Sequence, residues 1–202
     1  MTIDAIPHPT LYFGYGSNLW IDQMNRRCPE SKLVGIGLLK DWKWSINRRG
    51  YANIIPSPDD IVYGLVYELS PSDEASLDRS EGAPVIYAKQ NHPIAFTPLA
   101  VHTHHNHPDA QAPEASSPGS ESNSTTAKEM LVYVDIKRTK PGPPKEEYIY
   151  RINKGIVDGV KSGIPMAYFD KYFRQSIPPL PEVADEPEVK DPFDPQLYYV
   201  EA

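Results

Sequence analysis

The sequence contains a single cysteine, Cys28, among 202 residues. This count excludes an internal disulfide, and one free thiol is typical of a protein in a reducing compartment. The first ten residues, MTIDAIPHPT, lack the basic and apolar segments of a secretory signal. We therefore expect a cytoplasmic protein, and we interpret the Asn-Ser-Thr sequon at Asn123 as a chance match.

Long apolar runs and basic clusters are also missing. No segment approaches the ~20 consecutive apolar residues of a membrane-spanning helix. The chain carries 20 basic and 27 acidic residues, a net charge of -7, and the basic residues are scattered. Because a nucleic-acid surface needs a concentrated basic patch, we expect neither nucleic acid nor a membrane as a partner. The length favours one domain over residues 1–202, with its core at about 10–175, present as a monomer or a homodimer.

Several segments rich in β-branched and aromatic residues predict strands. The stretch PSPDD, residues 56–60, has the proline and aspartate content of a turn. It separates two of three strands that we expect to be antiparallel neighbours. Trp42 and Trp44 are interpreted as core residues of the first of these strands. The predicted strands cover 10–15, 32–47, 51–55, 61–69, 84–90, 94–101 and 131–136.

Four segments predict helices, at 19–28, 71–80, 146–163 and 165–176. The helix over 71–80 has the clearest boundaries. Ser70 stands at the N-cap position, and Asp73 follows where its carboxylate can accept from amides of the first turn. Gly82 stands where a left-handed residue commonly ends a helix.

Two segments have compositions that favour disorder. Residues 102–128 contain few groups that can offset the entropy cost of ordering, so we interpret them as a disordered insertion within one domain. Residues 178–202 form a proline-rich acidic tail that we expect to be extended. The insertion opens with HTHHNHPD, residues 102–109. Imidazoles can bind zinc or nickel, but a structural site usually needs ligands from a rigid framework, so we predict no metal and no cofactor.

The stretch FGYGSN, residues 13–18, places two glycines between a predicted strand and a predicted helix. Backbone N–H groups at a helix start lack intrahelical partners and point toward solvent. Gly14 and Gly16 can direct such amides at one anion, and Ser17 and Asn18 can cap the helix or contact a ligand. The alternative interpretation is an ordinary strand-to-helix turn.

Glu81 stands at the C-terminal end of the short helix, where the helix dipole disfavours a carboxylate. Partial burial would act in the same direction, so the sequence predicts a raised pKa for Glu81. A carboxylate of this kind can exchange a proton near neutral pH. The alternative is a solvated surface glutamate. Asp78, on the same helix, is expected to be a surface charge facing elsewhere.

The ordered pair YFGYGSNL and, ~60 residues later, LDRSEG resembles the γ-glutamylcyclotransferase family. The resemblance covers most of residues 10–175. It implies an α+β fold, in which a mixed, largely antiparallel sheet is curled into a small barrel with peripheral helices. It implies that Glu81 is the acid/base and that the Tyr15–Leu19 loop holds a γ-glutamyl group through its backbone. The substrate-binding residues that it implies are Tyr15, Gly16, Ser17, Asn18, Leu19, Tyr87, Tyr148 and Tyr168.

Family members release 5-oxoproline and a free amine or amino acid from a small-molecule γ-glutamyl compound, which is the activity that the resemblance implies here. Three alternatives stay open at this point. The chain can be a γ-glutamyl-binding module without turnover, a cyclotransferase for a glutathione-derived conjugate, or a thiol hydrolase using Cys28 activated by Arg26 and Arg27. Buried cysteine is commonly a small hydrophobe, which disfavours the hydrolase. Four further residues either line the pocket or lie at a solvated strand end, and the sequence does not distinguish the two: Arg48, Arg49, Tyr51 and Asn53.

Overall fold

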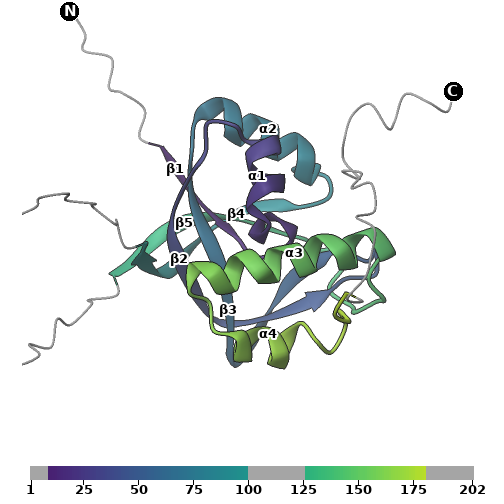
Figure 1. Cartoon of the computed structure of the whole chain (residues 1–202). Helices are drawn as coiled ribbons and strands as arrows, with labels where there is room; N and C mark the ends of the chain where they lie inside the picture. Colours follow the sequence, from purple (N-terminus) through teal and green to yellow (C-terminus); the bar gives the residue numbers. More distant parts are fainter. Residues whose placement is uncertain (1–8, 100–125, 181–202) are drawn as a thin grey trace, which may run out of the picture.

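The structure, a computed structural model, describes residues 9–99 and 126–180. Within these residues, five strands and four α-helices follow one another, with one 3-10 turn near the start (Figure 1). The described part of the chain contains no helix that is long and apolar enough to cross a bilayer. The elements are β1 (Thr10–Gly14), η1 (Ser17–Leu19), α1 (Ile21–Arg27), β2 (Lys32–Ile46), β3 (Ala52–Leu69), α2 (Pro71–Glu81), β4 (Ala88–Pro98), β5 (Thr126–Val134), α3 (Glu146–Ser162) and α4 (Met166–Tyr172).

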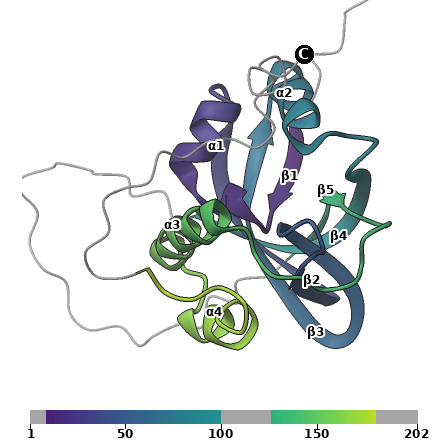
Figure 2. The same cartoon turned by 90° about the vertical axis from the view of Figure 1, so that its right-hand side faces the viewer.

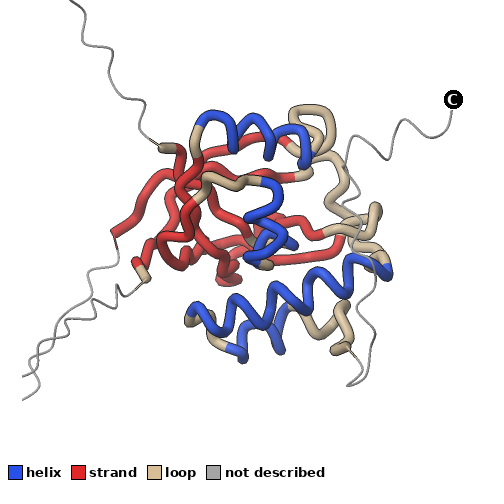
Figure 3. The backbone as a smooth tube through the Cα atoms, turned by 45° about the horizontal axis from the view of Figure 1, so that its top comes forward, coloured by secondary structure: helices blue, strands red, loops and turns tan. Residues whose placement is uncertain are grey.

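The five strands form a closed barrel in the order β1-β3-β2-β4-β5. Figure 3 shows the strands gathered together, with helices around them. Four of the five pairings are antiparallel, and β1 closes the barrel by pairing with β5 in parallel. Closure removes the exposed sheet edges that a five-stranded open sheet would leave. The predicted α+β fold, with a mixed and largely antiparallel barrel, is confirmed.

The prediction of three strands between 32 and 69 is wrong, because two long strands, β2 and β3, cover this region. Pairing passes directly from Lys40↔Ile61 to Trp42↔Pro56, so residues 57–60 lie outside the register as a bulge. Both Asp41 and Asp59 adopt positive φ, and the Asp59 amide donates to Asp41 Oδ1 at 3.2 Å. The PSPDD stretch therefore lies within β3. At the bulge, the Asp41 carboxylate accepts from the Asp59 amide in place of a strand-to-strand hydrogen bond.

The strands predicted at 84–90 and 94–101 are likewise one strand, β4, which includes Pro93. Pairing with β2 covers only Gly35–Leu38 opposite Ala95–Pro98, so Pro93 has β5 as its ladder neighbour. A residue without an N–H is tolerated on a strand edge of this kind. Strand β5 begins at Thr126, which corrects the predicted insertion by placing residues 126–128 in the sheet. The remaining insertion, 102–125, and the tail beyond 180 lie outside the described residues.

The helices lie around the barrel, with α1, α3 and α4 along one side and α2 at one end (Figure 2). Helix α2 begins as predicted, since Ser70 Oγ accepts from the Asp73 amide at 3.2 Å, and Gly82 ends it with φ 62°. The Asp73 carboxylate has another role, because its Oδ1 accepts from the Glu30 amide at 3.4 Å. The helix predicted over 19–28 is divided into η1 and α1.

Candidate active site

A cavity of about 40 Å³ lies between the loop after β1, the end of α2 and the first turns of α3, and it opens to solvent. Its walls are strongly polar, with six tyrosines, two arginines and one carboxylate. Seven of the nine predicted site residues line it, and Leu19 and Tyr168 do not. The lining residues are Tyr12, Tyr15, Gly16, Ser17, Asn18, Arg27, Tyr51, Ala52, Glu81, Tyr87, Tyr133, Tyr148 and Arg151.

The loop between β1 and α1 approaches the cavity through Gly16. A Cβ at Gly16 would lie 3.0 Å from the Tyr148 hydroxyl and 3.2 Å from Ala52 Cβ, so glycine permits this close contact. The Ser17 amide donates to the Tyr148 hydroxyl at 3.2 Å, and the Leu19 amide donates to the Gly16 carbonyl at 3.0 Å. The Leu19 amide is bonded within the 3-10 turn. It is therefore not one of the amides that can bind an anion, although the resemblance included Leu19 in the binding loop.

The start of α1 also differs from the expectation of an anion site at a helix N-terminus. The first helical amide, that of Ile21, donates to Asp158 Oδ2 at 2.9 Å. This carboxylate belongs to α3, so α1 is capped by a neighbouring helix rather than left open toward the cavity. Any ligand contact from the loop therefore comes from residues 15–18, which line the cavity.

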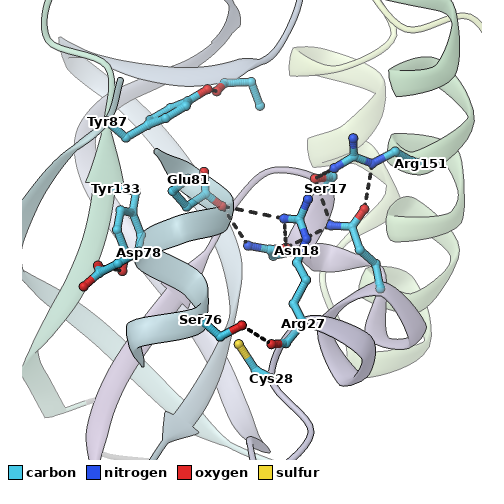
Figure 4. A network of polar contacts seen from close by, with 12 residues as sticks. Ser17, Asn18, Arg27, Cys28, Ser76, Asp78, Glu81, Tyr87, Tyr133 and Arg151 are labelled. Carbon is cyan, nitrogen blue, oxygen red and sulfur yellow. Dashed lines mark hydrogen bonds and ion pairs between the residues drawn. The ribbon is translucent and has the colours of Figure 1, made fainter. Parts of the chain in front are cut away.

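Glu81 stands at the last position of α2 with its side chain 15% exposed. Asn18 Nδ2 donates to Glu81 Oε1 at 3.2 Å, and Arg27 Nη1 lies 3.8 Å from the same oxygen (Figure 4). A nearby cation and an amide donor both favour the ionised carboxylate. The sequence argument considered only burial and the helix dipole, because neither partner is close to Glu81 in the chain.

The Asn18 side chain is held on both of its polar atoms. Its Nδ2 donates to the Tyr12 hydroxyl at 2.8 Å as well as to Glu81. Its Oδ1 accepts from Gln23 Nε2 and from Arg27 Nη1, each at 2.9 Å. These bonds use the amide's full hydrogen-bonding capacity and fix which end faces Glu81.

Arg151 extends this polar network from α3, and its side chain is almost fully buried. Its Nη2 donates to Ser17 Oγ at 2.8 Å, its Nε donates to Gln23 Oε1 at 2.6 Å, and its Nη1 donates to Glu147 Oε2 at 3.2 Å. The helix approaches the loop closely one turn later, at Gly155, where a Cβ would lie 2.9 Å from Leu19 Cβ. A small residue there lets α3 place a guanidinium beside the cavity.

The tyrosines of the cavity are neutral hydrogen-bonding groups. Burial, followed by the Glu81 carboxylate, raises the pKa of Tyr12 and of Tyr87 well above the usual value. Burial likewise raises the pKa of Tyr15, whose hydroxyl donates to the Tyr133 carbonyl at 2.6 Å. The Tyr87 hydroxyl donates to the Ala52 carbonyl at 3.0 Å. These hydroxyls keep their protons at neutral pH and therefore shape the cavity rather than act as bases.

Asp78 is 34% exposed and bonds to Tyr133 and Lys89 rather than to Glu81, in agreement with the expected surface charge facing elsewhere. Its Oδ1 accepts from the Tyr133 hydroxyl at 2.5 Å, and it also lies 3.0 Å from Lys89 Nζ. Tyr133 lines the cavity, so Asp78 orients one of the cavity walls from outside (Figure 4).

The model of the family described as gamma-glutamyl cyclotransferase, AIG2-like, matches residues 12–120. This chain belongs to that family. A gamma-glutamylcyclotransferase from Bos taurus is 34% identical over 82 residues, which covers 36% of this chain and 44% of the relative. The chain thus matches less than half the length of this curated relative.

Solved structures share the family's fold. One described as a gamma-glutamyl cyclotransferase superposes with a TM-score of 0.63 at 22% identity, over 89% of this chain and 94% of that chain. An uncharacterized protein from Homo sapiens gives a TM-score of 0.64 at 22% identity, over 90% and 95% of the two chains.

Two residues that the resemblance to gamma-glutamyl cyclotransferases assigns to substrate binding, Leu19 and Tyr168, do not line the cavity. Leu19 is fully buried and packs against Gly155, so it holds the loop rather than lining the site. Tyr168, on α4, packs in an aromatic cluster, with its ring 5.1 Å from Tyr63 and 5.6 Å from Phe173. A motif match gives the position in the chain, but the direction of a side chain depends on how α4 packs.

The other candidate sites have less support in this gamma-glutamyl cyclotransferase-like chain. Cys28 is fully buried, and its Sγ donates to the Asp73 carbonyl at 3.4 Å. Burial, followed by the charge of Asp73, raises the pKa of the Cys28 thiol to about 12. The histidine run at 102–109 lies outside the described residues, among which no three His, Cys, Asp or Glu side chains form a metal-binding group.

Five residues missed by the sequence analysis contribute to the site: Tyr12, Gln23, Arg27, Tyr133 and Arg151. No local pattern distinguishes a buried arginine from the many that lie at the surface. Of the residues whose roles were left open, Tyr51 lines the cavity, whereas Asn53 is buried and exchanges hydrogen bonds with the backbone of Asp135.

Proposed function

We propose that this chain is a γ-glutamylcyclotransferase, which cyclises the glutamyl part of a γ-glutamyl compound to 5-oxoproline and releases a free amine or amino acid. One observation carries the proposal: the Glu81 carboxylate faces the Asn18 amide and the Arg27 guanidinium beside a polar cavity. This arrangement supplies a proton acceptor beside a positive charge that can attract an anionic ligand. Membership of the family supports the same activity.

The reaction needs no nucleophile from the protein. Glu81 takes a proton from the α-ammonium group of the substrate, and the freed nitrogen attacks the γ-carbonyl carbon. Glu81 then gives a proton to the departing nitrogen as the original amide C–N bond breaks. The attacking nitrogen loses a second proton to solvent and remains as the lactam N–H, and the departing amine gains its second proton from solvent. Atoms and charge balance between a γ-glutamyl amide and 5-oxoproline plus an ammonium ion.

Positioning accounts for much of the expected rate enhancement. Holding an amine against a carbonyl in the same molecule can contribute ~7–11 kcal/mol, provided that the substrate is folded correctly. The tyrosine walls and the Gly16–Asn18 segment confine the glutamyl chain in this proposal. The guanidiniums of Arg27 and Arg151 provide positive charge for the α-carboxylate and for the oxyanion that develops on the γ-carbonyl.

The test is a panel of γ-glutamyl compounds incubated with the purified full-length chain, with 5-oxoproline measured by mass spectrometry. The panel includes γ-glutamyl amino acids, γ-glutamylamines and glutathione. Formation of 5-oxoproline in equal amount to the released amine supports the proposal. Absence of 5-oxoproline from every compound refutes it.

A binding protein without turnover is the alternative that the same cavity allows. Isothermal titration separates the two functions, because a binding protein gives heat of association with a γ-glutamyl compound and no product. A carboxylate at position 81 can bind the α-ammonium group in either case, so the formation of 5-oxoproline is the result that separates the enzyme from the binding protein.

A further inference from the structure

Gln23 lies on α1, is only 5% exposed and does not line the cavity. Both ends of its side-chain amide are nevertheless hydrogen-bonded to residues of the site. Its Oε1 accepts from Arg151 Nε at 2.6 Å, and its Nε2 donates to Ser17 Oγ at 3.0 Å and to Asn18 Oδ1 at 2.9 Å. Gln23 therefore connects the buried arginine of α3 to two neighbouring residues of the loop after β1.

Arg151 determines which end of the Gln23 amide faces that loop. A guanidinium has five N–H donors and no acceptor, so an oxygen has to lie against its Nε. With Oε1 in that place, the two N–H groups of Gln23 face Ser17 and Asn18. The guanidinium is itself held in position, because its Nη2 donates to Ser17 and its Nη1 donates to Glu147.

The Gln23 amide in turn determines the direction of two side chains that line the cavity. Asn18 presents Oδ1 to Gln23, so its Nδ2 faces Glu81 Oε1. Ser17 Oγ accepts from Gln23 and from Arg151, and these are its side-chain hydrogen bonds within the described residues. Since two donors fill the acceptor sites of the hydroxyl, its O–H can only donate, and it is available to a ligand in the cavity.

We propose that Gln23 is a positioning residue, which turns the hydrogen-bond donors of Ser17 and Asn18 toward the cavity. This inference rests on the proposed function, in which the γ-carbonyl oxygen needs a donor and the Glu81 carboxylate needs a fixed orientation. Gln23 acts through its neighbours, because it does not line the cavity itself.

Two substitutions separate the direction of these hydrogen bonds from the packing of the side chain. Gln23→Met has nearly the same size and removes the N–H groups without adding an acceptor. Ser17 then keeps its donor from Arg151, and Asn18 keeps its donor from Arg27. Gln23→Glu keeps an oxygen against Arg151 and places a second oxygen where Nε2 was. This new acceptor attracts the O–H of Ser17 and the N–H of Asn18 away from the cavity.

The activity and the stability of the two variants are expected to rank in opposite orders. The kcat for 5-oxoproline formation is expected to fall severalfold in Gln23→Met and by about tenfold more in Gln23→Glu. Urea unfolding is expected to find Gln23→Glu the more stable, because methionine leaves the Nε of the buried Arg151 unpaired. A purely structural role predicts the same order for both quantities. Asn25→Asp makes the same chemical change at an exposed position of α1, and it is expected to keep the wild-type kcat.

A double-mutant cycle with Ser17→Ala separates this effect from that of the added negative charge. If Gln23→Glu acts by turning the Ser17 hydroxyl, it costs less in kcat when the hydroxyl is absent. A general effect of charge on the cavity is the same in both backgrounds. Equal losses in kcat with and without the hydroxyl would therefore overturn the inference.

A second readout does not depend on turnover. The Nδ2 hydrogens of Asn18 are followed by ¹⁵N NMR of the full-length chain as the pH falls. Because they bond to Glu81, their signals are expected to move when that carboxylate takes up a proton, and Glu81→Gln is expected to abolish the movement. In Gln23→Glu the signals are expected to move whether or not Glu81 is replaced, because the N–H groups then bond to the new carboxylate.

Other titratable groups that face Glu81 do not interfere with this titration. Arg27 keeps its charge throughout. Burial raises the pKa of six further groups, which keep their protons at neutral and acidic pH: Tyr12, Tyr15, Cys28, Tyr87, Tyr133 and Tyr148.

The NMR result separates the inference from the proposed function. Asn18 signals that still follow Glu81 in Gln23→Glu would overturn the inference and leave the cyclotransferase activity intact. If the wild-type chain turns over no compound of the panel while the Asn18 signals behave as expected, the proposed function fails and the orientation of the donors by Gln23 stands.

Discussion

Asn18 Nδ2 donates to Glu81 Oε1 at 3.2 Å, although 63 residues separate them in the chain. The amide cannot rotate away, because Gln23 and Arg27 both donate to its Oδ1. The carboxylate of Glu81 is therefore held in one orientation by a side chain that is itself fixed. A general base in a fixed position is the arrangement that proton transfer from a bound substrate requires.

Replacing Glu81 by glutamine tests its role most directly. The variant keeps the size of the side chain and removes the proton acceptor, so we expect 5-oxoproline formation to fall about 10²–10⁴-fold. Binding of a γ-glutamyl compound, measured by isothermal titration, is expected to persist. Glu74→Gln is the matched control, since Glu74 lies on the same helix and accepts from Thr10 outside the cavity. Full activity of Glu81→Gln would remove Glu81 from the mechanism.

Arg27 is expected to control the pH dependence through Glu81. Its cation favours the ionised carboxylate, so Arg27→Gln makes Glu81 easier to protonate. The acid limb of the kcat/KM profile is then expected to move to higher pH. Arg27→Lys keeps the charge and is expected to shift the limb less. A lower kcat/KM with an unmoved acid limb would assign Arg27 a purely structural role.

The sequence predicts a feature of the site well when neighbouring residues in the chain determine that feature. The N-cap at Ser70, the left-handed Gly82 and the position of Glu81 between them follow from neighbouring residues, and the structure contains all three. The barrel followed from the resemblance of two motifs. Strand limits were less accurate, because the bulge in β3 depends on a carboxylate from β2 that the local sequence does not reveal.

The electrostatics of the site were the least predictable part. No local pattern predicts that Arg27 and Arg151 meet at one cavity, since their burial depends on how α1 and α3 pack against η1. Tyr168 shows that a residue within a matching motif can lie away from the site. Its motif matches the family, yet α4 places it among other aromatic residues, outside the cavity lining.

A Gly16→Ala variant tests the close contact between the loop and α3. The added Cβ would lie 3.0 Å from the Tyr148 hydroxyl, and relieving this contact is expected to cost about 1–3 kcal/mol of unfolding free energy. In a Tyr148→Phe background the same change is expected to cost less, because the hydroxyl is gone. Urea unfolding of the four proteins in the cycle measures the coupling. Additive effects would show that the loop relaxes without involving Tyr148.

Tyrosine-to-phenylalanine variants test which rings belong to the site. Tyr87→Phe removes a hydroxyl in the cavity wall that donates to the Ala52 carbonyl, and it is expected to lower kcat/KM about tenfold. Tyr168→Phe changes a residue outside the cavity, and it is expected to leave kcat/KM within about twofold of the wild type. A loss in Tyr168→Phe as large as in Tyr87→Phe, with unchanged stability, would place Tyr168 at the substrate.

Thiol reactivity decides between the cyclotransferase and a cysteine hydrolase. Burial raises the pKa of Cys28 to about 12, so at pH 8 only about one thiol in 10,000 is ionised. We expect Ellman's reagent to react slowly with the native chain and rapidly after unfolding in guanidinium chloride.

Cys28→Ala is expected to keep its kcat, with a modest loss of stability from the small cavity left beside Asp73. Rapid labelling of the native chain, accompanied by loss of 5-oxoproline formation, would instead assign the chemistry to the thiol. Because Arg27 is the one cation among the groups that shift this pKa and opposes the rise, Arg27→Gln is expected to make labelling slower still, whereas activation of a catalytic thiol would require the opposite balance of charge.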